Sequence, residues 1–295
     1  MTTTKMRRIR TVAAAAATVF ILSLLLILSS CASTESRLSA APIAKVAHRG
    51  GSLLAPENTL AAFQRGIDEG ADAIELDVHL SADGQLIVMH DPSLFRTTAH
   101  EGYIGDWIAL DLQSLDASAS YRGDTAYPVQ HVPTLEQVLA LVERQERSVA
   151  LQVEIKTDQK GRRYEGIEEA VVSALRLHGL IEETIIISFD FPTLLRIREI
   201  EPSLKLGALV NRAYLESIGM AGPAAVAASI ADLGVEYVAI NYAYLSQRLF
   251  DEFRSHNLLI GAWTVNNEKD IRRIAAMGVD FITSDRPDLL RELLD

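Results

Sequence analysis

Short apolar runs alternate with amphipathic segments along most of the chain, starting at Ile43. The short runs are typical of strands buried on both faces, and segments with apolar residues every three to four positions are typical of helices packed on a sheet. The pattern predicts strands at residues 43–48, 72–79, 149–155, 184–189, 205–210, 235–240, 258–264 and 279–283. It predicts helices at residues 59–69, 135–146, 164–178, 191–200, 222–233, 246–256, 268–277 and 287–293. Strands that alternate with helices indicate an α/β fold, and eight such units predict a TIM (β/α)8 barrel, whose functional residues gather at the carboxyl ends of its strands.

The second predicted unit departs from this repeat. Asp83 and Gly84 form a turn signal, and residues 85–90 alternate between apolar and polar positions as the partner strand of a hairpin does. We therefore expect an extra strand before any helix. Residues 92–132 follow without a clear period, with aromatic residues among Gly, Asp and Ser. Segments of this length in a compact domain are usually functional or locally folded, so we predict a lid-like insertion over the barrel mouth.

The N-terminal residues have the composition of an export signal, because basic side chains precede an Ala/Leu/Ile-rich run that ends in Leu28-Ser29-Ser30-Cys31. Cys31 is the only cysteine, so no intrachain disulfide can form, and the triplet before it resembles the bacterial lipobox. We predict a lipoprotein signal peptide at 1–30, lipidation of Cys31, a flexible tether at 31–42 and the barrel domain at 43–295. The domain would then be anchored to a membrane and face the periplasm or the cell exterior. The alternative is an uncleaved anchor with an incidental thiol, which gives the same sidedness.

The charge of the chain limits its partners. The formal net charge of −11 becomes −15 when the four basic residues of the signal are removed, because that segment has no acidic residue. A mature chain with this negative charge repels nucleic acid and anionic membrane surfaces, so we expect no nucleic-acid partner. If the protein handles a phosphate group, the positive charge must be local, from a metal ion and a few basic side chains.

Acidic side chains lie at the ends of two predicted strands. Glu75 and Asp77 are two positions apart, so they project from the same face of their strand. Glu154 and Lys156 repeat this spacing at the end of the next barrel strand. Each acid alone could form a salt bridge at the rim, for instance Glu154 with Lys156. Three carboxylates converging on one rim instead predict an all-oxygen site for one divalent cation, Mg²⁺ or Ca²⁺.

Two of the seven histidines lie at strand ends. His48 ends the first strand and His90 ends the extra strand, so both can face the space above the carboxylates. Histidine transfers protons well near neutral pH, and a pair on either side of one bond can act as general base and general acid. The alternatives are metal ligation or a structural role. His79 is expected to point away from the site of His90. No role is assigned to His79, nor to His100, His131, His178 and His256.

Further polar residues flank these positions. Arg49 precedes two glycines and offers a forked donor to a phosphate, where the glycines let the backbone approach closely. Glu57 is interpreted as a brace for Arg49 or a helix-dipole partner, and Asn58 as the N-cap of the first helix. Trp263 ends the seventh strand and could pack on a glycerol moiety or belong to the core. Asp285 is interpreted as the cap of the last helix.

A set of short motifs, taken in order, resembles the glycerophosphodiester phosphodiesterase family. The set is His48-Arg49-Gly50, Pro56-Glu57-Asn58-Thr59, Glu75-Leu76-Asp77-Val78, His90-Asp91, Pro133-Thr134-Leu135-Glu136, Glu154-Ile155-Lys156 and Trp263-Thr264-Val265-Asn266. The match extends from about residue 46 to residue 290, and the ordered combination is specific although each motif is short. The lipobox-like segment makes the chain resemble a bacterial lipoprotein member.

The resemblance implies a TIM barrel that hydrolyses glycerophosphodiesters to glycerol 3-phosphate and an alcohol with a bound divalent cation. It implies roles for seven residues: Glu75, Asp77 and Glu154 as metal ligands, His48 and His90 as the acid/base pair, and Arg49 and Lys156 as phosphate contacts. It also implies attack by the glycerol 2-hydroxyl, a cyclic phosphate, and opening of that phosphate by water.

Two other functions remain open at this stage. The same site could cleave lysophospholipids in a phospholipase D-type reaction, which an apolar mouth around Tyr103 and Trp107 would favour. The protein could also be a lipid-anchored module that binds phosphodiesters without cleaving them. The presence of both His48 and His90 speaks against that second reading.

Overall fold

The computed structural model describes residues 42–123, 127–218 and 222–295. The predicted signal peptide, Cys31 and all but the last residue of the predicted tether lie outside this described part. None of the helices in the described part is both long enough and apolar enough to cross a lipid bilayer.

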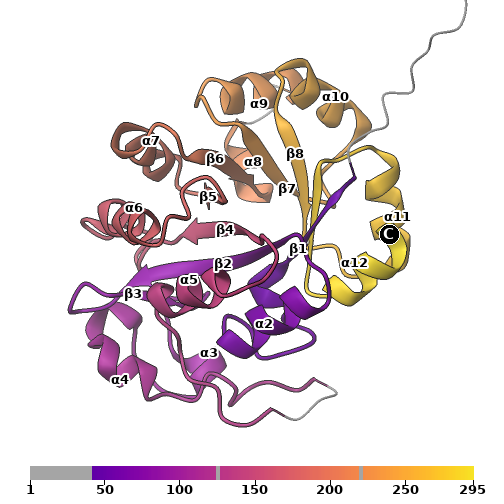
Figure 1. Ribbon diagram of the computed structural model, residues 1–295. Coiled ribbons are helices and arrows are strands. Elements are labelled where there is room, and N and C mark those ends of the chain that lie inside the picture. The colour runs from indigo at the N-terminus through magenta and orange to yellow at the C-terminus, as the bar shows by residue number, and fades with distance from the viewer. Residues whose placement is uncertain (1–41, 124–126, 219–221) are drawn as a thin grey trace, which may run out of the picture. The chain divides into compact units, whose positions relative to one another are not determined.

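A closed barrel of parallel strands forms the centre of the domain (Figure 1). Its strands are β1 Ala44–Ala47, β2 Ala73–Leu80, β4 Ala150–Ile155, β5 Thr184–Ser188, β6 Lys205–Val210, β7 Tyr237–Asn241, β8 Leu259–Trp263 and β9 Phe281–Ser284. Each pairs in parallel with its neighbours, and β1 bonds to both β2 and β9, which closes the ring. The prediction of a TIM barrel is confirmed.

Helices surround this ring and cover its outer face (Figure 1). They are α2 Leu60–Asp68, α5 Leu135–Glu143, α6 Ile167–Leu177, α7 Phe191–Ile200, α8 Arg212–Ile218, α9 Gly222–Ala231, α10 Gln247–Ser255, α11 Glu268–Ala276 and α12 Pro287–Leu294. Helix α8 was not predicted. Its apolar residues Tyr214, Leu215 and Ile218 are only partly buried against the core, and the helix is short, so its apolar period is a weak signal.

The extra strand of the second unit is also confirmed. Strand β3 Leu86–Val88 runs antiparallel to β2, with Val78 opposite Val88. The segment after it holds α3 Phe95–Thr98, the 3-10 turn η2 Ile104–Asp106 and α4 Ala109–Gln113.

This insertion has a small core of its own. The core consists of Ile87, Met89, Leu94, Ile104, Ala109, Leu112, Leu115, Ala117 and Val132. Helices α3 and α4 lie beside β3 and α2 (Figure 1). The described part of residues 92–132 does not line the cavity at the mouth of the barrel, and its lid-like role stays a prediction.

Packing inside the ring fixes where the cavity can open. The interior is filled by Val46, Ala73, Ile187, Leu209, Ala239 and Phe281. The ring of Phe281 occupies the space beside Gly261 so closely that a Cβ at that position would lie 1.9 Å from it. The barrel is therefore a packed core at this level, and space for a ligand remains only beyond the carboxyl ends of the strands.

Candidate active site

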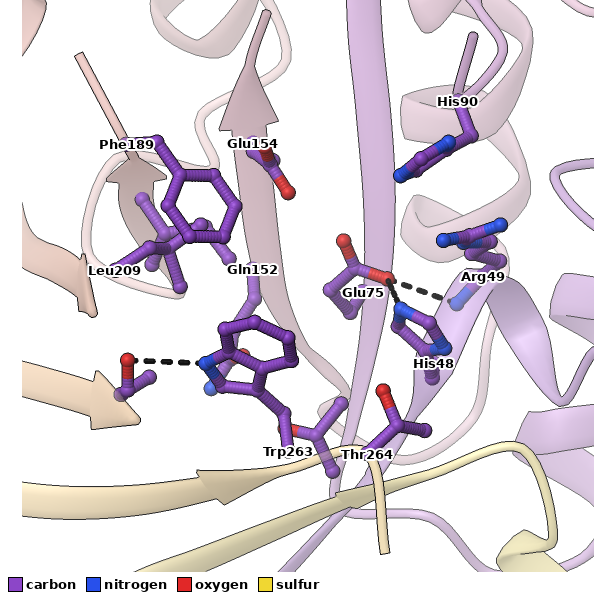
Figure 2. Close-up of a pocket in the computed structure, with 13 residues that line it drawn as sticks. His48, Arg49, Glu75, His90, Gln152, Glu154, Phe189, Leu209, Trp263 and Thr264 are labelled. Atoms are coloured by element: carbon purple, nitrogen blue, oxygen red, sulfur yellow. Dashed lines mark hydrogen bonds and ion pairs between the residues drawn. The ribbon is translucent and has the colours of Figure 1, made fainter. Parts of the chain in front are cut away.

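A cavity of about 90 Å³ opens at the carboxyl ends of the barrel strands. Its lining comes from at least six strands or the loops that follow them: His48, Arg49, Glu75, His90, Gln152, Glu154, Ile187, Phe189, Leu209, Ala239, Trp263, Thr264 and Thr283. In Figure 2 the basic side chains His48, Arg49 and His90 lie on one side and Phe189, Leu209 and Trp263 on the other, with Glu75 and Glu154 between them. The cavity therefore has a charged wall and an apolar wall.

The three predicted metal ligands form one cluster. Glu75 and Asp77 project from the same face of β2, and Asp77 lies opposite Glu154 of the neighbouring strand β4. Ligand atoms of all three carboxylates lie within 4.8 Å of one another, and all three residues are buried. The strand register thus produces the convergence that the sequence spacing predicted.

The electrostatics of this cluster favour a cation. Burial, followed by repulsion from Asp77 and Glu154, raises the pKa of Glu75 well above its ordinary value. Burial also raises the pKa of Glu154 to about 7. Burial acts in the same direction on Asp77, but Lys156, His90 and Arg49 outweigh it and lower the pKa of Asp77. Two of the three acids are therefore costly to ionise together unless further positive charge is present.

The donor set fits a hard divalent ion. Lys156 Nζ donates to Glu154 Oε1 at 2.6 Å and lies 2.9 Å from Asp77 Oδ1. Even so, Asp77 Oδ1 is buried and accepts no hydrogen bond with regular geometry among the described residues. A group of three buried carboxylates, in which Asp77 Oδ1 contacts only the Lys156 ammonium among the described residues, matches the oxygen-only coordination that Mg²⁺ and Ca²⁺ prefer. Glu75, Asp77 and Glu154 are thus the residues that could hold the predicted cation.

His48 is held by a carboxylate that comes 237 positions later in the sequence. Its Nδ1 lies 2.6 Å from Asp285 Oδ1, and its Nε2 lies 3.9 Å from Glu75 Oε2. Burial opposes ionisation of Asp285, but the hydrogen bond from His48 outweighs it and lowers the pKa of Asp285 to about 2. An ionised carboxylate only accepts hydrogen bonds, so Nδ1 carries the proton and the Nε2 lone pair faces the cavity.

The interpretation of Asp285 as a helix cap is wrong. Helix α12 begins at Pro287, its N-cap position is Arg286, and no side chain caps it. Asp285 instead turns back toward β1, where it accepts hydrogen bonds from Ser52 Oγ at 2.5 Å and Asn266 Nδ2 at 2.6 Å. These donors fix the carboxylate against His48.

His90 is arranged in the same way by its neighbour in sequence. Its Nδ1 lies 2.6 Å from Asp91 Oδ1. The hydrogen bond with His90 lowers the pKa of Asp91, so this carboxylate is ionised and accepts the Nδ1 proton. Burial lowers the pKa of His90 below its ordinary value. Both strand-end histidines are therefore held by a carboxylate at Nδ1, and both line the same cavity.

His79 does not point away from His90 as expected. It is fully buried, and burial lowers its pKa to about 4. Its Nε2 donates to the backbone carbonyl of His90 at 3.1 Å, which leaves Nδ1 to accept a hydrogen bond from the Tyr164 hydroxyl at 3.0 Å. The signal was present in the sequence, because positions 75, 77 and 79 alternate onto one face of β2.

Arg49 reaches the cavity from a strained turn after β1. Its own φ is 50° and that of Gly50 is 84°. A Cβ on Gly50 would lie 2.5 Å from the backbone of Ala62, so only glycine lets this turn rest on helix α2. The Nε of Arg49 is buried and without a hydrogen bond in the described structure, 3.6 Å from Asp77 Oδ2. The Arg49 guanidinium is therefore held between Asp77 and Glu57 at the edge of the cavity.

The residues before α2 support this arrangement. Glu57 Oε1 accepts a hydrogen bond from Arg49 at 2.9 Å, so Glu57 does brace Arg49 as interpreted. Asn58 is not the N-cap of α2, because Thr59 occupies that position and accepts a hydrogen bond from the Ala62 amide. Asn58 Nδ2 instead donates to Asp77 Oδ2 at 2.7 Å. Sequence spacing alone could not separate two adjacent residues that both suit a cap.

Trp263 forms part of the apolar wall. Its Nε1 donates to the Ala239 carbonyl at 3.0 Å, and its ring meets Phe189 edge to face with centroids 5.6 Å apart. The side chain is thus anchored in the barrel and also lines the cavity. Phe189, in the loop after β5, was not predicted and is 40% exposed.

Comparison with known proteins identifies the family. Residues 48–289 match the glycerophosphoryl diester phosphodiesterase family. This chain belongs to that family. A glycerophosphodiester phosphodiesterase of Bacillus subtilis is 32% identical over 302 residues, which are 98% of this chain and 99% of the relative. A second one, from Caldanaerobacter subterraneus, is 33% identical over 251 residues, which are 84% of this chain and 96% of the relative.

A solved relative adds a ligand to this comparison. The Oleispira antarctica phosphodiesterase, whose structure contains the product sn-glycerol-3-phosphate, has a TM-score of 0.68 and 25% identity. The alignment covers 86% of this chain and 97% of that structure. The prediction of an enzyme of the glycerophosphodiester phosphodiesterase family is confirmed.

The family region contains every site residue predicted within the barrel. The cavity is lined directly by His48, Arg49, Glu75, His90, Glu154 and Trp263. Asp77 and Lys156 are joined to it through Glu154 and through each other. The individual roles assigned to these residues stay predictions, and Cys31 lies outside the described residues.

Proposed function

We propose that this member of the phosphodiesterase family hydrolyses glycerophosphodiesters to glycerol 3-phosphate and an alcohol by His48 and His90 acid–base catalysis. The observation that carries the proposal is the pairing of two imidazoles, each held through Nδ1 by a carboxylate, with a buried acidic cluster in one cavity. The glycerol-3-phosphate bound by the Oleispira antarctica relative supports the substrate class.

In this mechanism the two histidines move protons at their Nε2 atoms. One histidine takes the proton of the substrate's glycerol 2-hydroxyl, whose oxygen forms a new bond to phosphorus. The bond from phosphorus to the head-group oxygen breaks, and the other histidine protonates the leaving alcohol. Water then adds to the cyclic phosphate with the two roles reversed, and the bond between phosphorus and the 2-oxygen breaks to give glycerol 3-phosphate.

Charge on the phosphoryl oxygens is balanced by groups on two sides of the cavity. Arg49 supplies its guanidinium from the lining of the cavity, and Lys156 supplies positive charge beside Asp77 and Glu154. A Mg²⁺ or Ca²⁺ ion held by Glu75, Asp77 and Glu154 would, when bound, add electrostatic stabilisation of the phosphoryl group. Each such contribution is worth about 3 kcal/mol in comparable sites.

The test is a substrate panel on metal-stripped protein reconstituted separately with Mg²⁺ and with Ca²⁺. Glycerophosphocholine, glycerophosphoethanolamine and glycerophosphoglycerol are offered, and phosphorus NMR follows glycerol 3-phosphate and any cyclic phosphate. We expect turnover that EDTA abolishes and that His48→Ala and Glu154→Ala remove without unfolding the protein. Retained turnover in the His48 variant would overturn the mechanism, and saturable binding without cleavage would support the binding-module alternative instead.

The lysophospholipid alternative depended on an apolar mouth around Tyr103 and Trp107. Neither residue lines the cavity, and Trp107 packs against the core of the insertion. The structure therefore offers no support for that alternative from these residues, and a micellar lysolipid assay serves as its control.

We further propose that the enzyme is an exported lipoprotein anchored through Cys31 and facing the periplasm or the cell exterior. The support is the sequence alone: four basic residues, an apolar run and a lipobox-like triplet before the single cysteine. Labelling of cells with a fatty acid, followed by intact-mass measurement of the purified protein, tests this. A mature chain that still contains residues 1–30, or a Cys31→Ala variant that keeps its label, would contradict it.

A further inference from the structure

Arg96 lies outside the barrel, on helix α3 of the insertion, and no sequence motif predicts it as a site residue. Its guanidinium nevertheless contacts two acids near the cavity. Nε donates to Asp91 Oδ2 at 2.5 Å, and the two terminal nitrogens donate to the two oxygens of Glu57 at 2.7 Å each. The second contact is the bidentate geometry that a planar guanidinium forms with a carboxylate.

Both acids also contact residues of the proposed mechanism. Asp91 uses its other oxygen to hold His90 Nδ1, and Glu57 holds a terminal nitrogen of Arg49. The result is an unbroken chain of charged contacts from His90 through Asp91, Arg96 and Glu57 to Arg49. Positive and negative groups alternate along it, so the central guanidinium neutralises a carboxylate on each side.

We propose that Arg96 is a positioning residue that fixes the His90 ring and the Arg49 guanidinium relative to each other; this rests on the roles proposed above for those two residues. The insertion thereby acts on the reaction without lining the cavity. Without Arg96, Asp91 keeps only His90 as a partner and Glu57 keeps only Arg49. Both carboxylates can then rotate, so the position of the His90 ring relative to the Arg49 guanidinium is no longer fixed.

A purely structural role for Arg96 fits the contacts less well. The insertion is held together by its own apolar core, in which Leu94, Ile104 and Leu112 are fully buried. The Arg96 side chain is 44% exposed, and ion pairs at that exposure contribute little to stability. Its removal is therefore expected to change the reaction more than the fold.

The experiment compares Arg96→Ala and Arg96→Lys with a matched control, Arg176→Ala. Arg176 also donates through Nε and a terminal nitrogen to one carboxylate, that of Glu201, and is 52% exposed, but it lies on helix α6 away from the cavity. The assay measures kcat and KM for glycerol 3-phosphate release from glycerophosphocholine, with and without added guanidinium ion below denaturing concentrations. Nitrogen NMR of the histidine rings reports whether His90 keeps its proton on Nδ1.

For Arg96→Ala we expect kcat to fall about 10- to 100-fold, the range for a small misplacement of reacting groups, with KM changed about threefold or less. Arg96→Lys restores only part of kcat, because a point charge cannot meet both carboxylates. Guanidinium ion restores activity to Arg96→Ala and not to Arg176→Ala.

A kcat within about twofold of the wild type in Arg96→Ala, or an equal loss in Arg176→Ala, would overturn the inference. If Arg96→Ala does not fold, Arg96→Lys takes its place with a smaller expected loss of kcat, and a wild-type kcat in Arg96→Lys then overturns the inference. A wild-type protein that cleaves no glycerophosphodiester refutes the proposed function instead. The NMR comparison then still decides the positioning role, because an unchanged His90 signal in the variant contradicts it.

Discussion

The substitution Asp285→Asn distinguishes two roles for one residue. As a helix cap, asparagine is about as good as aspartate, so neither stability nor activity would change much. As the partner of His48, the carboxylate cannot be replaced by an amide, which offers one oxygen and one NH₂ group in place of two oxygens. We expect a large loss of kcat.

The hydrogen-bond network predicts which way the new amide would face. Asn266 donates its NH₂ to Asp285 Oδ2, and its own oxygen accepts from the Asp285 amide at 2.9 Å and from Ser284 Oγ at 3.1 Å, so Asn266 cannot flip. The new carbonyl oxygen must therefore take the Oδ2 position, and the new NH₂ faces His48 Nδ1. The imidazole proton then moves to Nε2, the atom that must be free to accept a proton.

The magnitude follows from the bond that is lost. The contact between His48 Nδ1 and Asp285 Oδ1 is 2.6 Å long, and a hydrogen bond to a charged group contributes about 1.5–3 kcal/mol. If it stabilises the imidazolium formed during the reaction, its loss lowers kcat about 10- to 150-fold. The wrong tautomer adds to this and can bring the loss to about 10⁴-fold.

The assay is steady-state kinetics of glycerol 3-phosphate release, together with thermal unfolding. Asp288→Asn is the matched control, because Asp288 lies in the first turn of the same helix and pairs with Arg286 rather than with His48. We expect the control to keep wild-type kcat. A kcat for Asp285→Asn within about threefold of the wild type, or a loss shared by both variants, would refute the reasoning.

Three further predictions follow from other parts of the structure. Glu154→Gln removes one charge from the acidic cluster and is expected to weaken Mg²⁺ or Ca²⁺ binding on the order of 100-fold by titration calorimetry. His79→Phe leaves the His90 carbonyl without its side-chain donor, so urea unfolding should show a loss of about 1–3 kcal/mol, and kcat should fall. Hydrogen bonds from His178 to Glu136 and Glu143 raise its pKa above 6.5. Its folded-state pKa is thus higher than its unfolded one, so its contribution to stability is complete at pH values below 6.5 and is lost as the pH rises through the folded-state pKa. Because the two acids are half exposed, His178→Gln should cost about 0.5 kcal/mol at pH 5.5 and nothing measurable at pH 9.

Two of these predictions have a matched control variant, and for His178→Gln the measurement at pH 9 is the control. Glu168→Gln alters a buried glutamate outside the acidic cluster and should leave cation binding unchanged. Tyr164→Phe removes one of the two hydrogen bonds of His79 and should cost less than His79→Phe. Equal cation affinity in Glu154→Gln, equal stability in His79→Phe, or a pH-independent effect of His178→Gln would contradict the respective argument.

The acidic cluster could be predicted because it depends on short-range rules. The alternation of side chains along β2 puts Glu75 and Asp77 on one face, and the parallel register with β4 brings Glu154 beside them. Both rules act over a few residues or between neighbouring strands, so apolar runs and spacing were enough. The same alternation also places His79 on that face.

The partners of the histidines and of Arg49 were harder to predict. His48 and Asp285 are 237 positions apart, and their contact depends on closure of the ring. Arg96 comes from an irregular segment whose path no periodic pattern describes. Asn58 and Thr59 are both good caps by composition, and only the backbone turn before α2 decides between them. Contacts that depend on long-range closure or on loop geometry are the part that local rules cannot supply.

Strands β1 and β9 lie side by side, with Ala47 opposite Ser284. His48 and its carboxylate partner therefore follow directly after the first and the last strand of the barrel. A chain that stops short of its final strand would carry all three acids and both imidazoles, yet it would lack the group that orients one of them. A polypeptide truncated before Asp285 is therefore expected to have a much lower kcat for phosphodiester cleavage even where most of its secondary structure survives.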